Sequence, residues 1–225
     1  MTAMQVTHAL FALTTAPEGT EVECVIDRKP QHLTATGPLY HTSASNSTQA
    51  FFLAVTRREQ GRWQELCQVS VNLLREAGER QVRYNPYIYH WVAALQAFMT
   101  NRPGPVDEIT AAMELATPER AEFGSAENLN KLVFPQREAF LKFAQRDSAR
   151  FNDSLANRLR LFRDYHTSDE ERARSLDGTV PFGLLALACM AYDRSFHEPN
   201  FRLEVESDYL PKHIVERTWY GEFPT

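Results

Sequence analysis

The chain has 225 residues, of which 43% are hydrophobic and 11% aromatic, and this is enough bulky apolar material to bury one substantial core. We therefore expect one folded domain over residues 1–225, with a less regular segment at 1–45 and a helical body at 46–225. The formal net charge of −5 argues against general binding to nucleic acid, because affinity for phosphates needs a basic surface. Acidic proteins more often bind basic partners.

The cysteine pattern and the opening residues predict where the protein works. Cys24, Cys67 and Cys189 lie far apart, with neither a C-x-x-C pair nor a ligand-like cluster beside them. They predict buried thiols in a reducing compartment, the cytoplasm. The first residues lack the basic region of a secretory signal, so we expect mature protein. The longest apolar run, residues 180–191, is too short for the ~20 residues that a membrane-spanning helix needs, so no membrane association is expected.

Proline and glycine interrupt the first forty residues, which are expected to be the least regular part of the chain. In TEVECVI, the residues Val22, Cys24 and Ile26 alternate with two glutamates, a pattern typical of one short strand or an extended arm. The polar tract from His41 to Gln49 ends where FFLAV begins. One of its Ser or Thr residues is therefore expected to cap a helix.

Apolar residues at steps of three and four predict a series of helices beyond this tract. One amphipathic helix is expected from Arg62 to near Ala77, just before a glycine. A central helix, apolar almost all round, is expected to follow Asn85 and Pro86 in YIYHWVAALQAFM. The segment NRPGP breaks this helix, and helical spacing resumes at Val106.

The C-terminal half also keeps helical spacing. Residues 129–165 have helical period, and whether Asp147 and Ser148 divide them into two helices is left open. The charged residues 164–177 predict a solvated helix or loop with local ion pairs. A buried helix is expected after Pro181, and a short helix after the next polar break. The sequence therefore predicts a mainly all-α fold, an irregular multi-helix bundle, with either a short strand or an extended arm near the N-terminus.

The chain lacks the usual signatures of catalytic and cofactor sites. Its seven histidines are scattered singly, so no metal is expected. It has neither a phosphate-binding nor a dinucleotide-binding glycine pattern, so no cofactor is expected. His90, beside Trp91 in the central helix, is interpreted as a hydrogen-bonded structural or interface histidine. The surroundings of Ser125 lack the second glycine of a nucleophile elbow, and this serine is expected to cap a helix. No catalytic residue is predicted.

One concentration of positive charge contains the aromatic residues Phe162 and Tyr165. Its basic members are Arg158, Arg160, Arg163, Arg172 and Arg174. A mixture of this kind can bind single-stranded nucleic acid. However, acidic residues lie among these arginines and would cancel much of their field, which favours a solvated helical face.

Three carboxylates alternate in RLEVESDY, at Glu204, Glu206 and Asp208. In an extended segment these side chains would point to the same side. Carboxylates can perform acid–base chemistry without a fixed motif. Two interpretations of this row stay open: an anionic site presented to a cationic partner, or the edge of a solvated loop.

The C-terminal third resembles a family of bacterial polymorphic-toxin immunity proteins, the immunity protein 49 family. The resemblance depends on PFGLLALACMAYDRSF, followed after a short gap by ESDYLPKHIV, with a weaker likeness in YNPYIYHWVAALQAFM. The sequence SDYLP is its most informative part. Tyr209 and Leu210 are expected to anchor the chain against the core, and Pro211 to begin the last helix.

The resemblance implies a protein that is not an enzyme and that binds a cognate antibacterial toxin, a secretion-system effector encoded by an adjacent gene. It would block the toxin stoichiometrically by occluding the active site. A net charge of −5 suits a DNase or other nuclease, whose active site holds an anion. Glu204, Glu206 and Asp208 are the predicted toxin-binding residues. The alternative is a helical hydrolase of unrecognised type that uses His90 with convergent carboxylates in a deep pocket.

Overall fold

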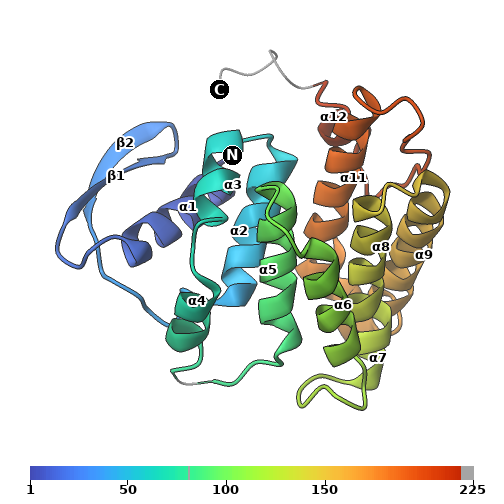
Figure 1. Cartoon of the computed structure of the whole chain (residues 1–225), viewed down its shortest axis with the longest axis horizontal. Coiled ribbons are helices and arrows are strands. Elements are labelled where there is room, and N and C mark those ends of the chain that lie inside the picture. The colour runs from blue at the N-terminus through green and yellow to red at the C-terminus, as the bar shows by residue number, and fades with distance from the viewer. Residues whose placement is uncertain (81, 219–225) are drawn as a thin grey trace. The chain divides into compact units, whose positions relative to one another are not determined.

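The computed structural model describes residues 1–80 and 82–218. The chain forms two compact units, Met1–Glu108 and Ile109–Thr225, and each is described by itself. Helices dominate both units, and the sheet found among the described residues has two strands (Figure 1). The prediction of a mainly all-α fold with a short strand near the N-terminus is therefore confirmed. A single domain over residues 1–225 stays a prediction.

The first unit is built around α2. Its elements are α1 (Thr2–Thr15), β1 (Glu21–Ile26), β2 (Lys29–Thr34), α2 (Ala44–Thr56), α3 (Gln60–Leu66), α4 (Val71–Gly78) and α5 (Tyr87–Met99). Helix α2 contacts α1, α3, α4 and α5, and its Ala50 and Ala54 are buried in one core with Phe11 of α1. Small side chains on α2 let these neighbours approach closely. The side chain of Ser43 accepts a hydrogen bond from the Asn46 amide at 3.3 Å, the cap expected in this tract.

The first forty residues are more regular than expected, because α1 is a 14-residue helix. It has no side-chain cap and no acidic residue in its first turn, so the usual start signals are missing. Contacts with α2 and β1 stabilise it instead. The predicted strand is β1, which pairs antiparallel with β2. Strand β2 contains Pro30, which disfavours a strand assignment. The hairpin turns through Asp27 and Arg28, with φ of 51° and 63°.

The prediction of a single helix from Arg62 to near Ala77 is wrong, because the chain forms α3 and α4 with a turn between them. In this turn the Val69 carbonyl accepts a hydrogen bond from the buried Gln96 side chain of α5 at 2.8 Å. The Cys67 carbonyl accepts one from Arg102 at 3.4 Å. These side chains replace helical amide donors, so the helix can end without leaving a buried carbonyl unpaired. The local spacing of apolar residues carries no sign of either partner.

The central helix is confirmed as α5, whose buried residues include Trp91 and Leu95. The three cysteines are free and buried, as expected. Burial raises the pKa of the Cys67 thiol to about 12, so this thiol stays protonated at neutral pH and is a poor nucleophile.

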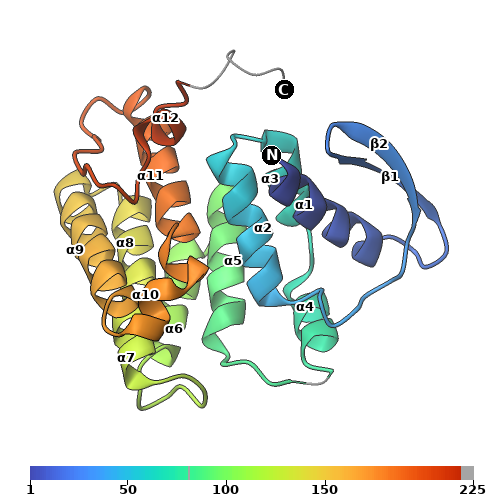
Figure 2. The same ribbon diagram turned by 180° about the vertical axis from the view of Figure 1, so that it is seen from behind.

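The second unit begins within α6 (Pro105–Leu115). Its further elements are α7 (Ala126–Asn128), a π-helical turn (Leu129–Val133), α8 (Phe134–Ala144), α9 (Ser148–His166), α10 (Glu170–Arg174), a 3-10 turn (Leu176–Gly178), α11 (Phe182–Ser195) and α12 (Lys212–Val215). Helix α8 packs against α9 and α11 (Figures 1 and 2). The sequence left open whether Asp147 and Ser148 divide residues 129–165 into two helices. They do, because the Asp147 side chain accepts a hydrogen bond from the Arg150 amide and caps α9. Ser125 caps α7, as expected.

A buried arginine supplies a hydrogen-bond donor at the start of α8. Pro135 has no amide hydrogen for the carbonyl four residues earlier, that of Lys131. Nη1 of Arg158, on α9, donates to this oxygen at 2.7 Å. Arg158 is 4% exposed, and burial lowers the pKa of its guanidinium, as does the charge of Arg137. The expectation that Arg158 belongs to a solvated face is therefore wrong.

Replacing Arg158 tests this substitution of one donor for another. Arg158→Met should lower the free energy of unfolding by about 1–3 kcal/mol, because the Lys131 carbonyl loses its donor. In a Pro135→Ala background the new amide can serve that carbonyl, so the same replacement should cost less. Urea unfolding of all four proteins measures the coupling. Equal costs in both backgrounds would show that Arg158 does not replace the missing amide.

Candidate functional site

Residues 202–208, here called the acidic segment, lie between α11 and α12 without regular secondary structure. Polar side chains of α9 hold its backbone. Asn152 accepts a hydrogen bond from the Glu204 amide and donates one to the Arg202 carbonyl, both at 2.8 Å. Ser148 accepts from the Arg202 amide at 3.0 Å and donates to its carbonyl at 3.1 Å. These bonds fix the position of the segment along α9.

Buried apolar residues anchor the acidic segment on both sides. Before it, Phe201 is 2% exposed and packs edge-on against Phe143 of α8, with ring centroids 5.7 Å apart. After it, Leu210 is buried, and Tyr209 packs edge-on against Phe162 of α9 at 5.3 Å. The prediction that Tyr209 and Leu210 anchor the chain against the core is confirmed.

Arg194 completes the anchor at Phe201. Its guanidinium carbon lies 3.8 Å from the Phe143 ring centroid and 5.1 Å from that of Phe201. Its Nη1 donates to the Phe143 carbonyl. Burial lowers the pKa of Arg194, and the Glu198 carboxylate opposes this shift. The sequence shows this residue only as the basic half of an Asp–Arg pair at the end of an apolar helix, which carries no signal of its position in the cluster.

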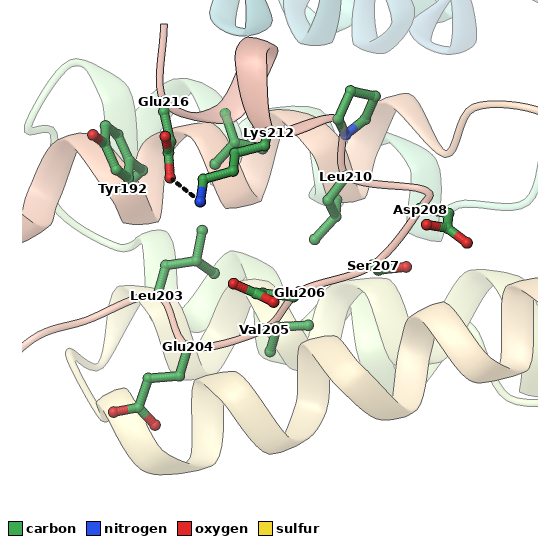
Figure 3. A pocket seen from close by; sticks show the side chains of 12 residues that line it. Tyr192, Leu203, Glu204, Val205, Glu206, Ser207, Asp208, Leu210, Lys212 and Glu216 are labelled. Carbon is green, nitrogen blue, oxygen red and sulfur yellow. Dashed lines mark ion pairs between the residues drawn. The ribbon is translucent and has the colours of Figure 1, made fainter. Parts of the chain in front are cut away.

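Between the anchors, side chains alternate as expected of an extended segment. Glu204, Glu206 and Asp208 are exposed, whereas Leu203 and Val205 are half-buried. Figure 3 shows the Glu206 side chain extending into a hollow, with the carboxylates of Glu204 and Asp208 spread to either side of it. The three predicted residues therefore belong to one surface without forming a tight cluster.

The acidic segment, α12 and the end of α11 surround a hollow of about 610 Å³. Its apolar lining consists of Tyr192, Leu203, Val205, Leu210, Pro211 and Val215. Its charged lining consists of the three predicted acidic residues together with Lys212 and Glu216. Lys212 and Glu216 lie 3.7 Å apart. Among the described residues, the hollow therefore presents four carboxylates against one ammonium group, around an apolar floor.

This lining is suited to recognition. Carboxylates can bind a cation while the apolar floor accepts the stem of its side chain. The described residues that line the hollow include neither histidine nor cysteine. In the described part of the chain, no group of three or more His, Cys, Asp or Glu side chains could hold a metal ion.

His90 lies in the first unit and makes a simpler contact than the hydrolase alternative requires. Its Nδ1 is 2.8 Å from Oε2 of Glu108, and both side chains are more than a third exposed. His90 does not line the hollow. The alternative needed several carboxylates converging on this histidine, whereas the structure gives it a hydrogen-bonded surface pair of the structural kind.

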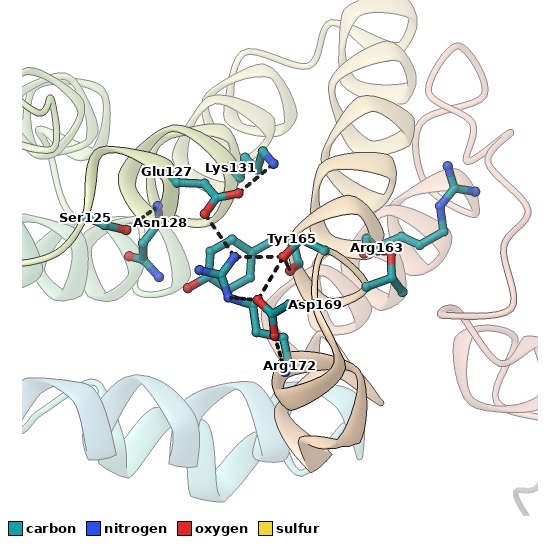
Figure 4. A network of polar contacts seen from close by, with 10 residues as sticks. Ser125, Glu127, Asn128, Lys131, Arg163, Tyr165, Asp169 and Arg172 are labelled. Carbon is teal, nitrogen blue, oxygen red and sulfur yellow. Dashed lines mark hydrogen bonds and ion pairs between the residues drawn. The ribbon is translucent and has the colours of Figure 1, made fainter.

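The basic concentration makes local pairs, and Figure 4 shows those around Arg172. Glu127 of α7 accepts from Lys131 at 2.8 Å and from Arg172 at 2.9 Å, and Arg172 lies over the Tyr165 ring at 4.1 Å. Hydrogen bonds from these two cations lower the pKa of Glu127, and Glu127 raises that of Arg172. Arg160 pairs with Asn157, Arg163 with Asp164 and Arg174 with Glu170. These contacts support the solvated-face interpretation for the exposed arginines.

Asn152 gives a direct test of how the acidic segment is held. Asn152→Ala should speed amide hydrogen exchange in residues 202–206 and lower the free energy of unfolding by about 1–3 kcal/mol, because the Glu204 amide loses its acceptor and the Arg202 carbonyl keeps only the donor from Ser148. The matched control is Asn157→Ala, at an exposed position of the same helix, which should change neither quantity. Unchanged exchange in the Asn152 variant would show that α9 does not hold the segment.

The second unit is thus a helical scaffold that presents an acid-rimmed hollow. The sequence profile of the family described as Immunity protein 49 matches residues 1–214, and the chain belongs to this family. The match spans both units, well beyond the C-terminal resemblance. No curated protein and no solved structure matches the chain. Among the described residues, no helix is both long and apolar enough to cross a membrane.

Proposed function

We propose that this immunity protein neutralises a cognate antibacterial toxin by binding it at the hollow, with Glu204, Glu206 and Asp208 in the interface. The observation that carries the proposal is the combination of four carboxylates with an apolar floor on a chain of net charge −5. Protein interfaces combine an apolar centre with a polar rim, and complementary charge selects the partner. Neutralisation by binding needs no chemical step.

The partner in this proposal is a DNase or other nuclease. It is encoded by the adjacent gene and delivered as a polymorphic toxin through a secretion system. The two proteins meet in the cytoplasm. A nuclease holds a polyanion, so its substrate groove carries lysine and arginine side chains. The carboxylates of the hollow suit those cations, and their binding would exclude the phosphates from the same groove. The immunity protein would then act by stoichiometric occlusion of the active site.

Charge reversal tests the site. The triple variant Glu204→Lys, Glu206→Lys, Asp208→Lys should bind a catalytically inactive form of the adjacent-gene toxin at least about 100-fold more weakly, because attraction becomes repulsion at each position. Isothermal titration calorimetry measures the affinity. The control reverses three exposed carboxylates of the first unit, Glu18, Glu21 and Glu23; it has the same charge change and should bind nearly as wild type. Unchanged affinity in the first variant would remove these residues from the interface, and equal losses in both would show that net charge alone matters.

Occlusion makes a separate prediction about the mechanism. The active toxin should lose its nuclease activity at one equivalent of immunity protein, and an uncleavable oligonucleotide should compete with the immunity protein for the toxin. Gel filtration with light scattering gives the stoichiometry, and fluorescence anisotropy of the labelled oligonucleotide gives the competition. A stable ternary complex would overturn occlusion. If the two proteins formed no complex and the immunity protein did not protect toxin-expressing cells, the proposed function itself would be overturned.

A further inference from the structure

An exposed aromatic side chain adjoins the hollow. Phe196 is the C-cap residue of α11 and is 68% exposed. Its ring packs edge-on against Tyr192, one turn earlier, with centroids 5.1 Å apart. Tyr192 in turn lines the hollow. The apolar surface therefore continues from the floor of the hollow, across Tyr192, to a phenylalanine that faces solvent.

The turn that carries Phe196 is well held. The amides of His197 and Glu198 both donate to the Arg194 carbonyl at 2.9 Å. The Glu198 carboxylate lies 3.6 Å from Arg146 and 3.7 Å from Arg194. Since Arg194 is itself stacked on the buried aromatic cluster, the turn is tied to the core of the second unit. A side chain presented by an ordered turn loses less conformational entropy when it binds a partner.

We propose that Phe196 is the apolar anchor of the toxin interface, inserting into an apolar pocket of the toxin while the adjacent hollow receives a lysine or arginine from beside that pocket. This inference rests on the proposed function. Aromatic residues dominate the affinity of many interfaces when polar groups beside them exclude water, and the hollow that Tyr192 lines brings acidic residues to the same surface. The charge of the hollow selects the occupant, because a second copy of this acidic chain would bring like charges together.

A substitution at Phe196 tests the anchor. Phe196→Ala should weaken binding to the inactive adjacent-gene toxin by about 10- to 100-fold, because a phenylalanine is no longer buried in the complex. Most of the loss should appear in the dissociation rate. Phe196→Leu should retain more of the affinity than the alanine variant. Surface plasmon resonance gives both rate constants, and thermal unfolding checks that the exposed position leaves stability unchanged.

Leu176→Ala is the matched control, because Leu176 is 83% exposed in the same unit and does not line the hollow. Leu176 lies before the start of α11, whereas Phe196 follows its end. Helix α11 has 14 residues and is therefore about 21 Å long. This variant should bind within about twofold of wild type. The loss at Phe196 should persist at 500 mM salt, where charge-reversal effects shrink.

The outcomes separate the two proposals. Wild-type binding with an unaffected Phe196→Ala variant overturns the anchor and leaves the proposed function standing. Equal losses at Phe196 and Leu176 also overturn it, because general apolar surface would then explain the effect. No binding by the wild type overturns the proposed function, and the anchor with it.

Discussion

The burial of Phe201 is the contact on which the surface of the second unit depends. Its ring packs against Phe143 of α8 and Phe151 of α9, at 5.7 and 5.4 Å, and Arg194 covers the cluster from α11. Phe201 holds the start of the acidic segment at this cluster, and Asn152 forms hydrogen bonds with the backbone of the segment. The acidic segment therefore runs along α9. Its carboxylates therefore rim a hollow with an apolar floor, where an unanchored loop would present them separately to solvent.

The carboxylates and the apolar residues of this surface have different physical roles. Exposed carboxylates act over distances of about a Debye length and favour encounter with a cationic partner, an effect that salt weakens. Apolar contacts act only when water is excluded, so they govern how long a complex lasts. Glu206 extends into the hollow (Figure 3), and Phe196 adjoins it through Tyr192. In the interface that we propose, a partner would have to match both features at once, and this would give the specificity that an immunity protein needs against unrelated basic proteins.

A helix could be predicted from the sequence where the residues that start or end it lie close to it along the chain. Capping residues and proline breaks are local, so a Ser or Thr cap in the tract 41–49, which the structure shows to be Ser43, and the apolar helix after Pro86 could be predicted. Helix α1 has no such cap, and its contacts with α2 and β1 lie outside any local window. The turn between α3 and α4 depends on the Gln96 side chain, which comes from 27 residues further along the chain. Spacing rules read these residues as one continuous helix.

The sequence by itself determined the mainly helical class, the buried helix after Pro181, the alternation of Glu204, Glu206 and Asp208, and a resemblance to the family that the profile match then showed. These features depend on composition and on residues within a turn or two of one another. Only the tertiary structure decided that Arg158 is buried, and that Phe196 contacts Tyr192 in the lining of the hollow. The physical reason is that burial and charge environment depend on distant partners: the bond between Asn152 and the Glu204 amide joins positions 52 residues apart.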